Sequence, residues 1–342
     1  MNGFVKSFVF PFLIALVIFS VIAAVAMPPI LSLVFASDES EVTDENESDF
    51  SDSFSNTLNS KANGVLSLML ICTENTPKNN TSNDAVTVGD DPDEITDIQL
   101  EFDGLINKTN VKPTKTIKFI TVAIFDSVLN RVSVTYIPPE TQVTVKGAKT
   151  DLDTVLFCAE NNLYDVTYDY FTDYALSVTG FRPDFYGFED IKEYIKIADT
   201  FNDLTVKMNE SINIRSSNGL MMPYRAGTLT VSSSDLYNLI TCDSYTDSTT
   251  KGTILESLSL SVLDKITTLS YYAESEAAFN RCVSSMYRTN ASYDIFSEKS
   301  ALFFSYKLYS HIMVNLIGEI NTTSDKMVFI PNKSASVEIF KK

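Results

Sequence analysis

The sequence predicts an α/β protein: a three-layer domain with a central mixed β-sheet flanked by helices, preceded by an N-terminal transmembrane helix. Three observations predict it. An uncharged apolar stretch lies near the N-terminus, a polar acidic stretch follows, and from Gly64 onward strand-like apolar runs alternate with amphipathic helical runs. We therefore divide the chain into residues 1–36, residues 37–63 and residues 64–342.

Residues 1–36 are predicted to be a short cytoplasmic start followed by a transmembrane signal-anchor. Phe8–Ala36 carries no charge, and its first part, Phe8–Met27, is 20 residues long. At ~1.5 Å per residue a helix of this length spans ~30 Å, one hydrocarbon core. Lys6 precedes it and acidic residues follow it, which predicts a single-pass protein of the cell membrane with an extracellular C-terminal domain. The alternative is a signal peptide cleaved after Val34–Ala36, which also exports the domain.

Residues 37–63 are predicted to be an acidic, disordered linker. Eight acidic side chains lie between positions 38 and 52 without a basic one, and large apolar residues are almost absent. The whole chain has 26 basic and 44 acidic residues, a formal net charge of −18. This charge repels phosphate backbones, so we expect no nucleic-acid partner.

The centre of the predicted sheet is a hairpin. Two apolar runs, Phe119–Phe125 and Val132–Ile137, flank the polar turn Asp126–Arg131. The second run ends at Pro138–Pro139, because proline has no N–H to donate to a sheet. Four further strands are predicted, at Gly64–Thr73, Leu100–Ile106, Leu204–Ile214 and Met327–Ile330. Helices are predicted at Asp151–Asn161, Glu189–Phe201, Thr249–Tyr272 and Ser292–Val314, and one more helix is predicted to begin with a cap at Ser232–Asp235.

Tyr164–Phe188 is dense in aromatic residues. Two interpretations remain open: the rings pack in the core, or part of the segment lines a groove for a long apolar ligand.

Cysteine and histidine usage restricts the chemistry. Cys72, Cys158, Cys242 and Cys282 lie far apart without CxxC spacing, so we expect buried free thiols, with one long-range disulfide as the alternative. His311 is the single histidine and is expected to be structural. A histidine-dependent zinc site or a Ser-His-Asp triad elsewhere in the chain is therefore excluded.

The order of segments from Gly64 to Pro331 resembles the LytR–CpsA–Psr (LCP) family. The best match is Val122–Val143 (VAIFDSVLNRVSVTYIPPETQV), which is similar to that family's strand, turn, strand and "SIPRDT-x-V" element. Further similar segments are Asp151–Tyr164, Tyr186–Met208, Gly227–Asp243 and Asn290–Tyr306. The resemblance implies a membrane-anchored extracellular protein that transfers anionic glycopolymers from a polyprenyl-pyrophosphate carrier to peptidoglycan.

The resemblance also implies the site. An LCP site holds two phosphates with arginines and Mg²⁺ with acidic residues. The matching positions that keep a charged side chain are Glu74, Lys118, Glu140 and Lys251, with Glu74 and Glu140 as the candidate Mg²⁺ ligands. Arginine positions of the family are occupied by Thr76, Pro139, Thr241, Asp243 and Ile254, and a glutamine position by Leu255.

These substitutions favour a degenerate LCP domain. Proline and threonine cannot replace a guanidinium that grips phosphate with two hydrogen bonds. We therefore expect lost or weakened glycopolymer transfer, with the domain acting as a binding or scaffold module. One alternative is an active, divergent phosphotransferase that uses Glu74 and Glu140 on the metal and Lys118 or Lys251 on phosphate. A third is an unrelated exported α/β binding domain.

Overall fold

The computed structural model describes residues 64–75, 115–201, 203–216, 219–242, 245, 248–268, 275–323 and 326–341. They belong to one compact unit. The predicted signal-anchor and linker, residues 1–63, and the predicted strand Leu100–Ile106 lie outside the described residues. In the part of the chain that is described, no helix has both the length and the apolar composition needed to cross a bilayer.

The core of the domain is a six-stranded mixed sheet in the order β11-β6-β1-β2-β3-β12. Antiparallel pairs are β1 with β2, β2 with β3 and β11 with β6, whereas β1–β6 and β3–β12 are parallel. The strands are β1 (Val65–Asn75), β2 (Lys115–Asp126), β3 (Arg131–Ile137), β6 (Phe185–Asp190), β11 (Met286–Thr289) and β12 (Ser310–Met313). The mixed central sheet that the sequence predicts is confirmed.

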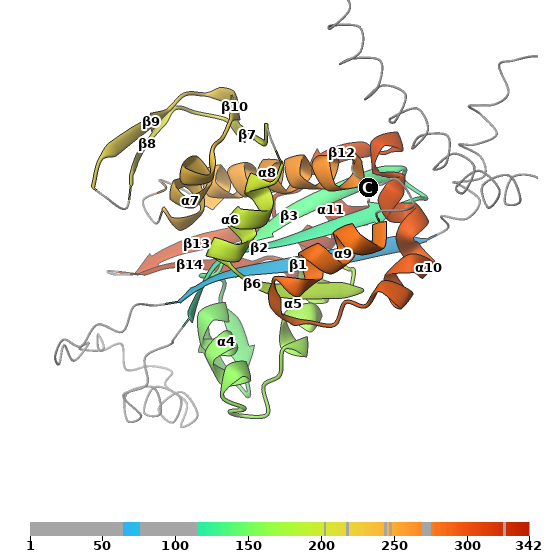
Figure 1. Cartoon of the computed structure of the whole chain (residues 1–342). Coiled ribbons are helices and arrows are strands. Elements are labelled where there is room, and N and C mark those ends of the chain that lie inside the picture. The colour runs from blue at the N-terminus through green and yellow to red at the C-terminus, as the bar shows by residue number, and fades with distance from the viewer. Residues whose placement is uncertain are drawn as a thin grey trace, which may run out of the picture. The chain divides into compact units, whose positions relative to one another are not determined.

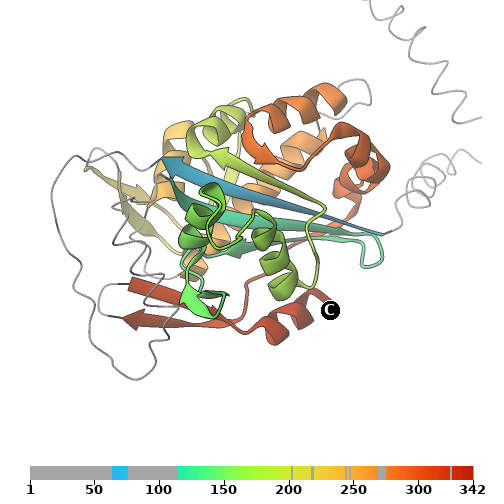
Figure 2. The same ribbon diagram turned by 90° about the horizontal axis from the view of Figure 1, so that it is seen from below.

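Helices cover both faces of this sheet (Figures 1 and 2). Three helices pack on one face: α4 (Leu152–Glu160), α5 (Asp169–Thr179) and α11 (Lys333–Lys341). The opposite face carries α6 (Ile191–Asp199), α7 (Ser233–Thr241), α8 (Ser248–Thr268), α9 (Ser275–Ser284) and α10 (Tyr293–Phe304). Side chains alternate along each strand, so β2 gives Val122 to the first face and Phe125 to the second.

Two-stranded ribbons surround the three layers. They are β4 (Val143–Val145) with β5 (Ala148–Thr150), β7 (Thr205–Met208) with β10 (Gly227–Thr230), β8 (Ile212–Arg215) with β9 (Met221–Tyr224), and β13 (Gly318–Thr323) with β14 (Lys326–Pro331). The predicted last strand, Met327–Ile330, forms as part of β14, which pairs with β13 and does not belong to the central sheet.

The central hairpin forms as predicted. Ile120 pairs with Ile137 and Asp126 with Arg131, so the turn occupies residues 127–130. The β3 strand ends at Ile137, directly before the proline pair.

Two element predictions are wrong. Ser292–Val314 is not one helix: α10 ends at Phe304, a single 3₁₀ turn, η1 (Tyr306–Leu308), follows, and β12 adds a strand beside β3. Leu204–Ile214 is not one strand, because a turn at residues 209–211 sends β7 and β8 into different ribbons. In both places a sheet edge supplies hydrogen-bond partners that the local pattern does not reveal.

Candidate functional site

One end of the sheet gathers polar side chains, because β1, β3 and β6 all end there and β2 begins there. Glu74, near the end of β1, forms an ion pair with Lys118 of β2, with 3.1 Å between Oε2 and Nζ. Tyr237 of α7 donates its hydroxyl to the other oxygen, Glu74 Oε1, at 2.8 Å. The two charged side chains are 24% and 15% exposed, so solvent reaches the pair only in part.

Glu140 lies in the loop after the proline pair and is held by backbone contacts. Its carbonyl accepts from the Phe329 N–H of β14 at 3.1 Å, and the Gln142 N–H donates to Phe329 O at 2.8 Å. Pro138 O accepts the Thr141 N–H at 3.1 Å and the Thr141 hydroxyl at 2.5 Å. The loop that matches the family's "SIPRDT" element is therefore a compact turn held against β14.

Lys251 lies near the N-terminal end of α8 and is buried, with its ammonium 6.0 Å from the centre of the Tyr245 ring. The structure thus brings Glu74 and Lys118 into contact. Glu140 instead lies against β14, and Lys251 lies over the Tyr245 ring.

The described residues do not fit Mg²⁺ well. Among them there is no group of three or more His, Cys, Asp or Glu side chains that could hold a metal ion. Both oxygens of Glu74 already accept from Lys118 or Tyr237, and an ammonium beside a carboxylate opposes binding of a second cation.

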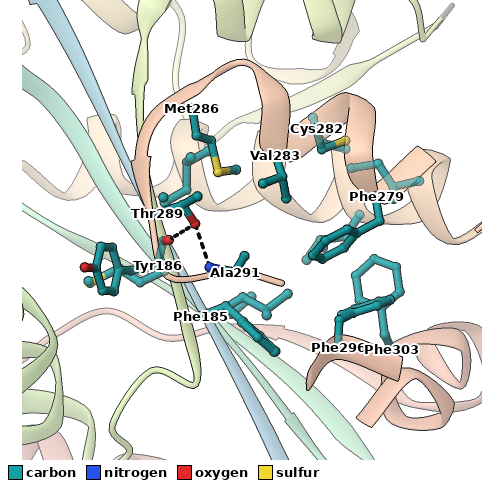
Figure 3. Close-up of a pocket in the computed structure, with 18 of the residues that line it drawn as sticks. Phe185, Tyr186, Phe279, Cys282, Val283, Met286, Thr289, Ala291, Phe296 and Phe303 are labelled. Atoms are coloured by element: carbon teal, nitrogen blue, oxygen red, sulfur yellow. Dashed lines mark hydrogen bonds between the residues drawn. The ribbon is translucent and has the colours of Figure 1, made fainter. Parts of the chain in front are cut away.

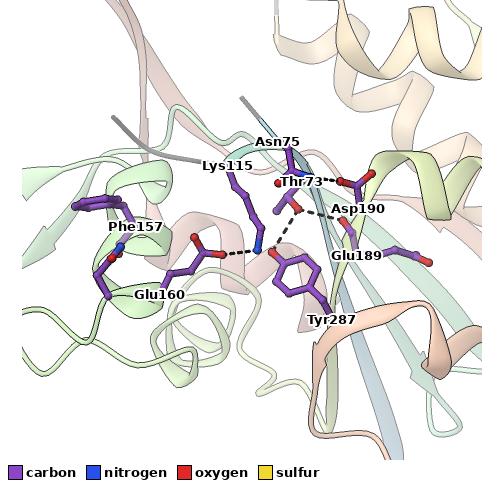
Figure 4. Close-up of polar contacts among 9 residues, drawn as sticks. Thr73, Asn75, Lys115, Phe157, Glu160, Glu189, Asp190 and Tyr287 are labelled. Atoms are coloured by element: carbon purple, nitrogen blue, oxygen red, sulfur yellow. Dashed lines mark hydrogen bonds and ion pairs between the residues drawn. The ribbon is translucent and has the colours of Figure 1, made fainter. Parts of the chain in front are cut away.

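A second polar group lies at the same sheet end on the α4 side (Figure 4). Lys115 is paired with Glu160 at 2.7 Å, and its ammonium lies 3.7 Å from the centre of the Tyr287 ring. Tyr287 and Thr73 share a hydroxyl contact of 3.3 Å, and Asn75 donates to Asp190 at 3.0 Å. The sequence analysis missed this group, because the residues come from five separate segments.

The polar interior near this end contains a protonatable carboxyl. Glu189 is 2% exposed, and burial raises its pKa to about 7, against the hydrogen bond donated by Ser285. Burial and the nearby carboxylates Glu189, Asp190 and Glu74 raise the pKa of the Cys72 thiol, which makes that thiol a poor nucleophile. All four cysteines are free, so the expectation of unpaired thiols is confirmed.

An apolar cavity of about 230 Å³ lies between the sheet and α8, α9 and α10 (Figure 3). Its wall includes Leu68, Phe185, Leu263, Phe279, Met286 and Phe303, and Cys282 also lines it. Two hydroxyl groups at its edge are hydrogen-bonded to backbone: Thr289 donates to Tyr186 O and accepts from the Ala291 N–H at 3.0 Å, and Ser259 donates to Leu255 O at 2.8 Å. The cavity therefore suits an apolar ligand without charged groups.

The aromatic segment Tyr164–Phe188 packs mainly in the core, and its end borders the cavity. Phe171, Tyr174 and Phe188 are buried in the core on the α4–α5 face. Phe185 and Tyr186, at its end, line the cavity. The other cavity walls come from α8 to α10, which the pattern of the segment does not reveal.

Comparison with known proteins identifies the architecture. No protein-family profile and no curated protein sequence matches the chain. Solved structures do match. A putative transcription regulator from Eubacterium siraeum has a TM-score of 0.54 at 10% identity, covering 89% of this chain and 98% of its own. TagV of B. subtilis has a TM-score of 0.53 at 12% identity, covering 81% and 94%.

TagT, solved bound to LIIa-WTA, has a TM-score of 0.50 at 13% identity and covers 82% of this chain and 90% of its own. TagV and TagT are LCP proteins. The chain has the LCP fold. At these identities the likeness is one of fold, and the LCP-fold domain departs from its relatives at most side chains. The resemblance found in the order of its sequence segments agrees with this result.

Proposed function

We propose that this LCP-fold protein is a membrane-anchored, extracellular component of the cell envelope that binds a polyprenyl-linked glycopolymer precursor and has lost or weakened glycopolymer transfer. The observation that carries the proposal is the apolar cavity between the sheet and α8–α10. TagT, which shares the fold, was solved bound to LIIa-WTA, a wall teichoic acid precursor. Peptidoglycan is the acceptor that the family resemblance implies.

The size of the cavity sets what it holds. At about 230 Å³ it is somewhat smaller than the ~300–1,000 Å³ typical of ligand sites, so it takes part of a polyprenyl chain rather than the whole of it. The lining is mostly apolar and includes Met69 and Met286, whose flexible side chains adapt by rotamer changes.

The weakened transfer follows from the charges at the sheet end. Both lysines there already have carboxylate partners, Glu74 for Lys118 and Glu160 for Lys115. Each charge-assisted phosphate contact contributes about 1.5–3 kcal/mol, and the family's arginine positions carry Pro139 and Thr241. The lysines of β2 are therefore not free to grip a diphosphate and position it for attack.

Cys282 reports on occupancy of the cavity. It is partly exposed and lines the cavity, whereas the other three cysteines are buried. A long-chain polyprenyl phosphate in detergent should slow alkylation of Cys282 by a small maleimide, measured by mass spectrometry, relative to detergent alone. An unchanged alkylation rate at saturating lipid would contradict binding in the cavity.

A cavity-filling variant separates this effect from surface adsorption. Val283→Trp places an indole in the cavity and should abolish calorimetric binding of the polyprenyl phosphate. Leu220→Trp is the matched control, because Leu220 is 62% exposed and lies outside the cavity lining. Equal binding by both variants would place the lipid elsewhere.

Transfer is tested separately, with a polyprenyl-pyrophosphate glycan donor, Mg²⁺ and peptidoglycan. We expect no product above the background without protein. Product formation that disappears in a folded Glu140→Ala variant would instead support the active, divergent phosphotransferase with Glu74 and Glu140 on the metal.

A further inference from the structure

The end of the sheet opposite the polar site exposes large apolar side chains from three separate segments. In the turn between β2 and β3, Val128 is 80% exposed and Leu129 38% exposed. Leu308, in the 3₁₀ turn before β12, is 53% exposed, and Ile295 of α10 is 54% exposed. We call these four residues the apolar rim. Neighbouring exposed apolar residues of this size indicate an interaction surface.

Hydrogen bonds hold the segments of the rim at one sheet end. The Ser310 N–H of β12 donates to Asn130 O at 2.9 Å, which places Leu308 near the turn that carries Leu129. Lys299, one helical turn after Ile295, donates to Val65 O at 3.1 Å at the start of β1.

The exposed turn has a fixed backbone. Asp126 Oδ1 accepts from the N–H groups of Val128 and Leu129 at 2.8 and 3.0 Å. Two side chains that would be buried in a core are thus presented to solvent by a structured turn.

The chain reaches the domain at this rim. Gly64 N donates to Ser127 Oγ at 2.9 Å, and Ser127 N donates to Gly64 O at 3.2 Å, so the residue before β1 is joined to the β2–β3 turn. Figure 2 shows the start of β1 and this turn at the same end of the sheet. The uncharged stretch Phe8–Ala36 is separated from Gly64 by the 27 residues 37–63.

We propose that the apolar rim docks on the lipid bilayer, inserting Val128, Leu129, Ile295 and Leu308 at the level of the headgroups. This inference rests on the membrane anchor proposed above: the chain enters the domain at Gly64, beside the turn that carries Val128, so anchoring through residues 1–36 favours contact of this face with the bilayer. Near the rim, Lys299 and Lys307 are each paired with an aspartate, Asp184 and Asp264. The exposed carboxylates Asp294 and Glu298 flank Ile295, so the attraction is apolar rather than electrostatic.

Docking in this orientation turns the Glu74–Lys118 end of the sheet away from the bilayer. The cavity lies on the sheet face between the two ends, and its lining residue Phe303 packs against Phe125, 5.6 Å between ring centres, next to the turn. This orientation does not depend on any ligand in the cavity.

The chain contains no tryptophan, so one introduced indole is a unique fluorescent reporter. The full chain is reconstituted in vesicles of phosphatidylcholine, without polyprenyl lipid, and compared with vesicles of brominated phosphatidylcholine, whose bromine quenches only an inserted indole. Val128→Trp and Leu308→Trp are the rim reporters. Leu220→Trp, on the β8–β9 ribbon, is the control because it is similarly exposed at 62%.

We expect both rim reporters to shift to shorter emission wavelengths and to lose most of their emission in brominated vesicles, and the control to lose little. Adding aspartate at position 129 (Leu129→Asp) to the Leu308→Trp chain should restore its emission. Absence of quenching at both rim reporters, or equal quenching of the control, would overturn the proposal. A blue shift that needs no lipid and rises with protein concentration would assign the rim to a second copy of the chain and would also overturn it. Because no polyprenyl lipid is present, these results are independent of the proposed ligand.

Discussion

Glu256 of α8 is a carboxyl group in the interior of the domain, with 1% of its surface exposed. Its Oε1 accepts the Tyr136 N–H at 3.0 Å, at a point of β3 beyond the last residue paired with β12. Among the described residues its Oε2 has no hydrogen-bond partner. The Glu256 side chain therefore accepts the hydrogen bond that a neighbouring strand would accept at this edge of β3. Burial raises the pKa of Glu256 to about 8, although the hydrogen bond from the Tyr136 N–H lowers it.

This raised pKa predicts a pH-dependent stability. Between about 4.5 and 8 the folded protein holds the Glu256 proton more tightly than the unfolded chain, so the free energy of unfolding decreases as pH rises through that window. Glu256→Gln removes the ionisation and keeps an acceptor for Tyr136. Relative to wild type it should gain about 2–4 kcal/mol of stability between pH ~5 and pH ~8, measured by urea unfolding.

The comparison is a difference between two proteins, so the similar contribution of Glu189 cancels. Glu298→Gln, at an exposed position of α10, should leave the pH profile unchanged. A constant difference between Glu256→Gln and wild type across the window would show that Glu256 does not titrate there.

At the scale of elements, local chemistry fixes where several helices begin. Asp151 caps α4 by accepting from Thr154 N at 2.9 Å and from the Thr154 hydroxyl at 2.7 Å. Ser232 and Asp235 form a capping box at the start of α7. This helix brings Tyr237 to Glu74. Both starts agree with the sequence analysis, because a cap depends on residues only three positions apart.

Removal of one cap has a predictable cost. Asp151→Ala should lower the free energy of unfolding by about 1 kcal/mol, and the melting temperature by about 2–4 °C, because a helix N–H loses its acceptor. Asp169→Ala is the control: Asp169 lies in the first turn of α5, whose N-cap makes no side-chain bond. Equal effects of the two substitutions in thermal unfolding would mean that charge near the helix end, not the cap, is responsible.

At the scale of the whole molecule, the architecture separates two surfaces. The polar sheet end holds Glu74, Lys118 and Lys115, and the opposite end holds the apolar rim. The net charge of −18 opposes association with nucleic acid.

The proposed location predicts a topology. With the full chain expressed in intact bacteria stripped of their wall, externally added protease should digest the domain of residues 64–342, and a chain without residues 1–36 should remain inside and protected. A tag at the N-terminus of the full chain should survive the protease. Protection of the domain in the full chain would contradict extracellular exposure.

The sequence alone predicted what depends on neighbouring residues. The hairpin with its turn at Asp126–Arg131, the end of β3 at the proline pair, the cap of α7 and the three buried free thiols of Cys72, Cys158 and Cys242 all follow from local pattern. The order of these segments also indicated the LCP fold.

Tertiary structure decided what joins distant segments. Whether Ser310–Met313 is helix or strand depends on the open edge of β3, about 180 residues earlier, which no local period encodes. Of the four candidate site residues, the structure joins Glu74 to Lys118 and holds Glu140 and Lys251 by other contacts, because positions on strands become neighbours only through sheet register. The cavity could not be predicted from the sequence, because its walls come from three helices and from strands such as β1 and β2 that lie far from those helices in the chain.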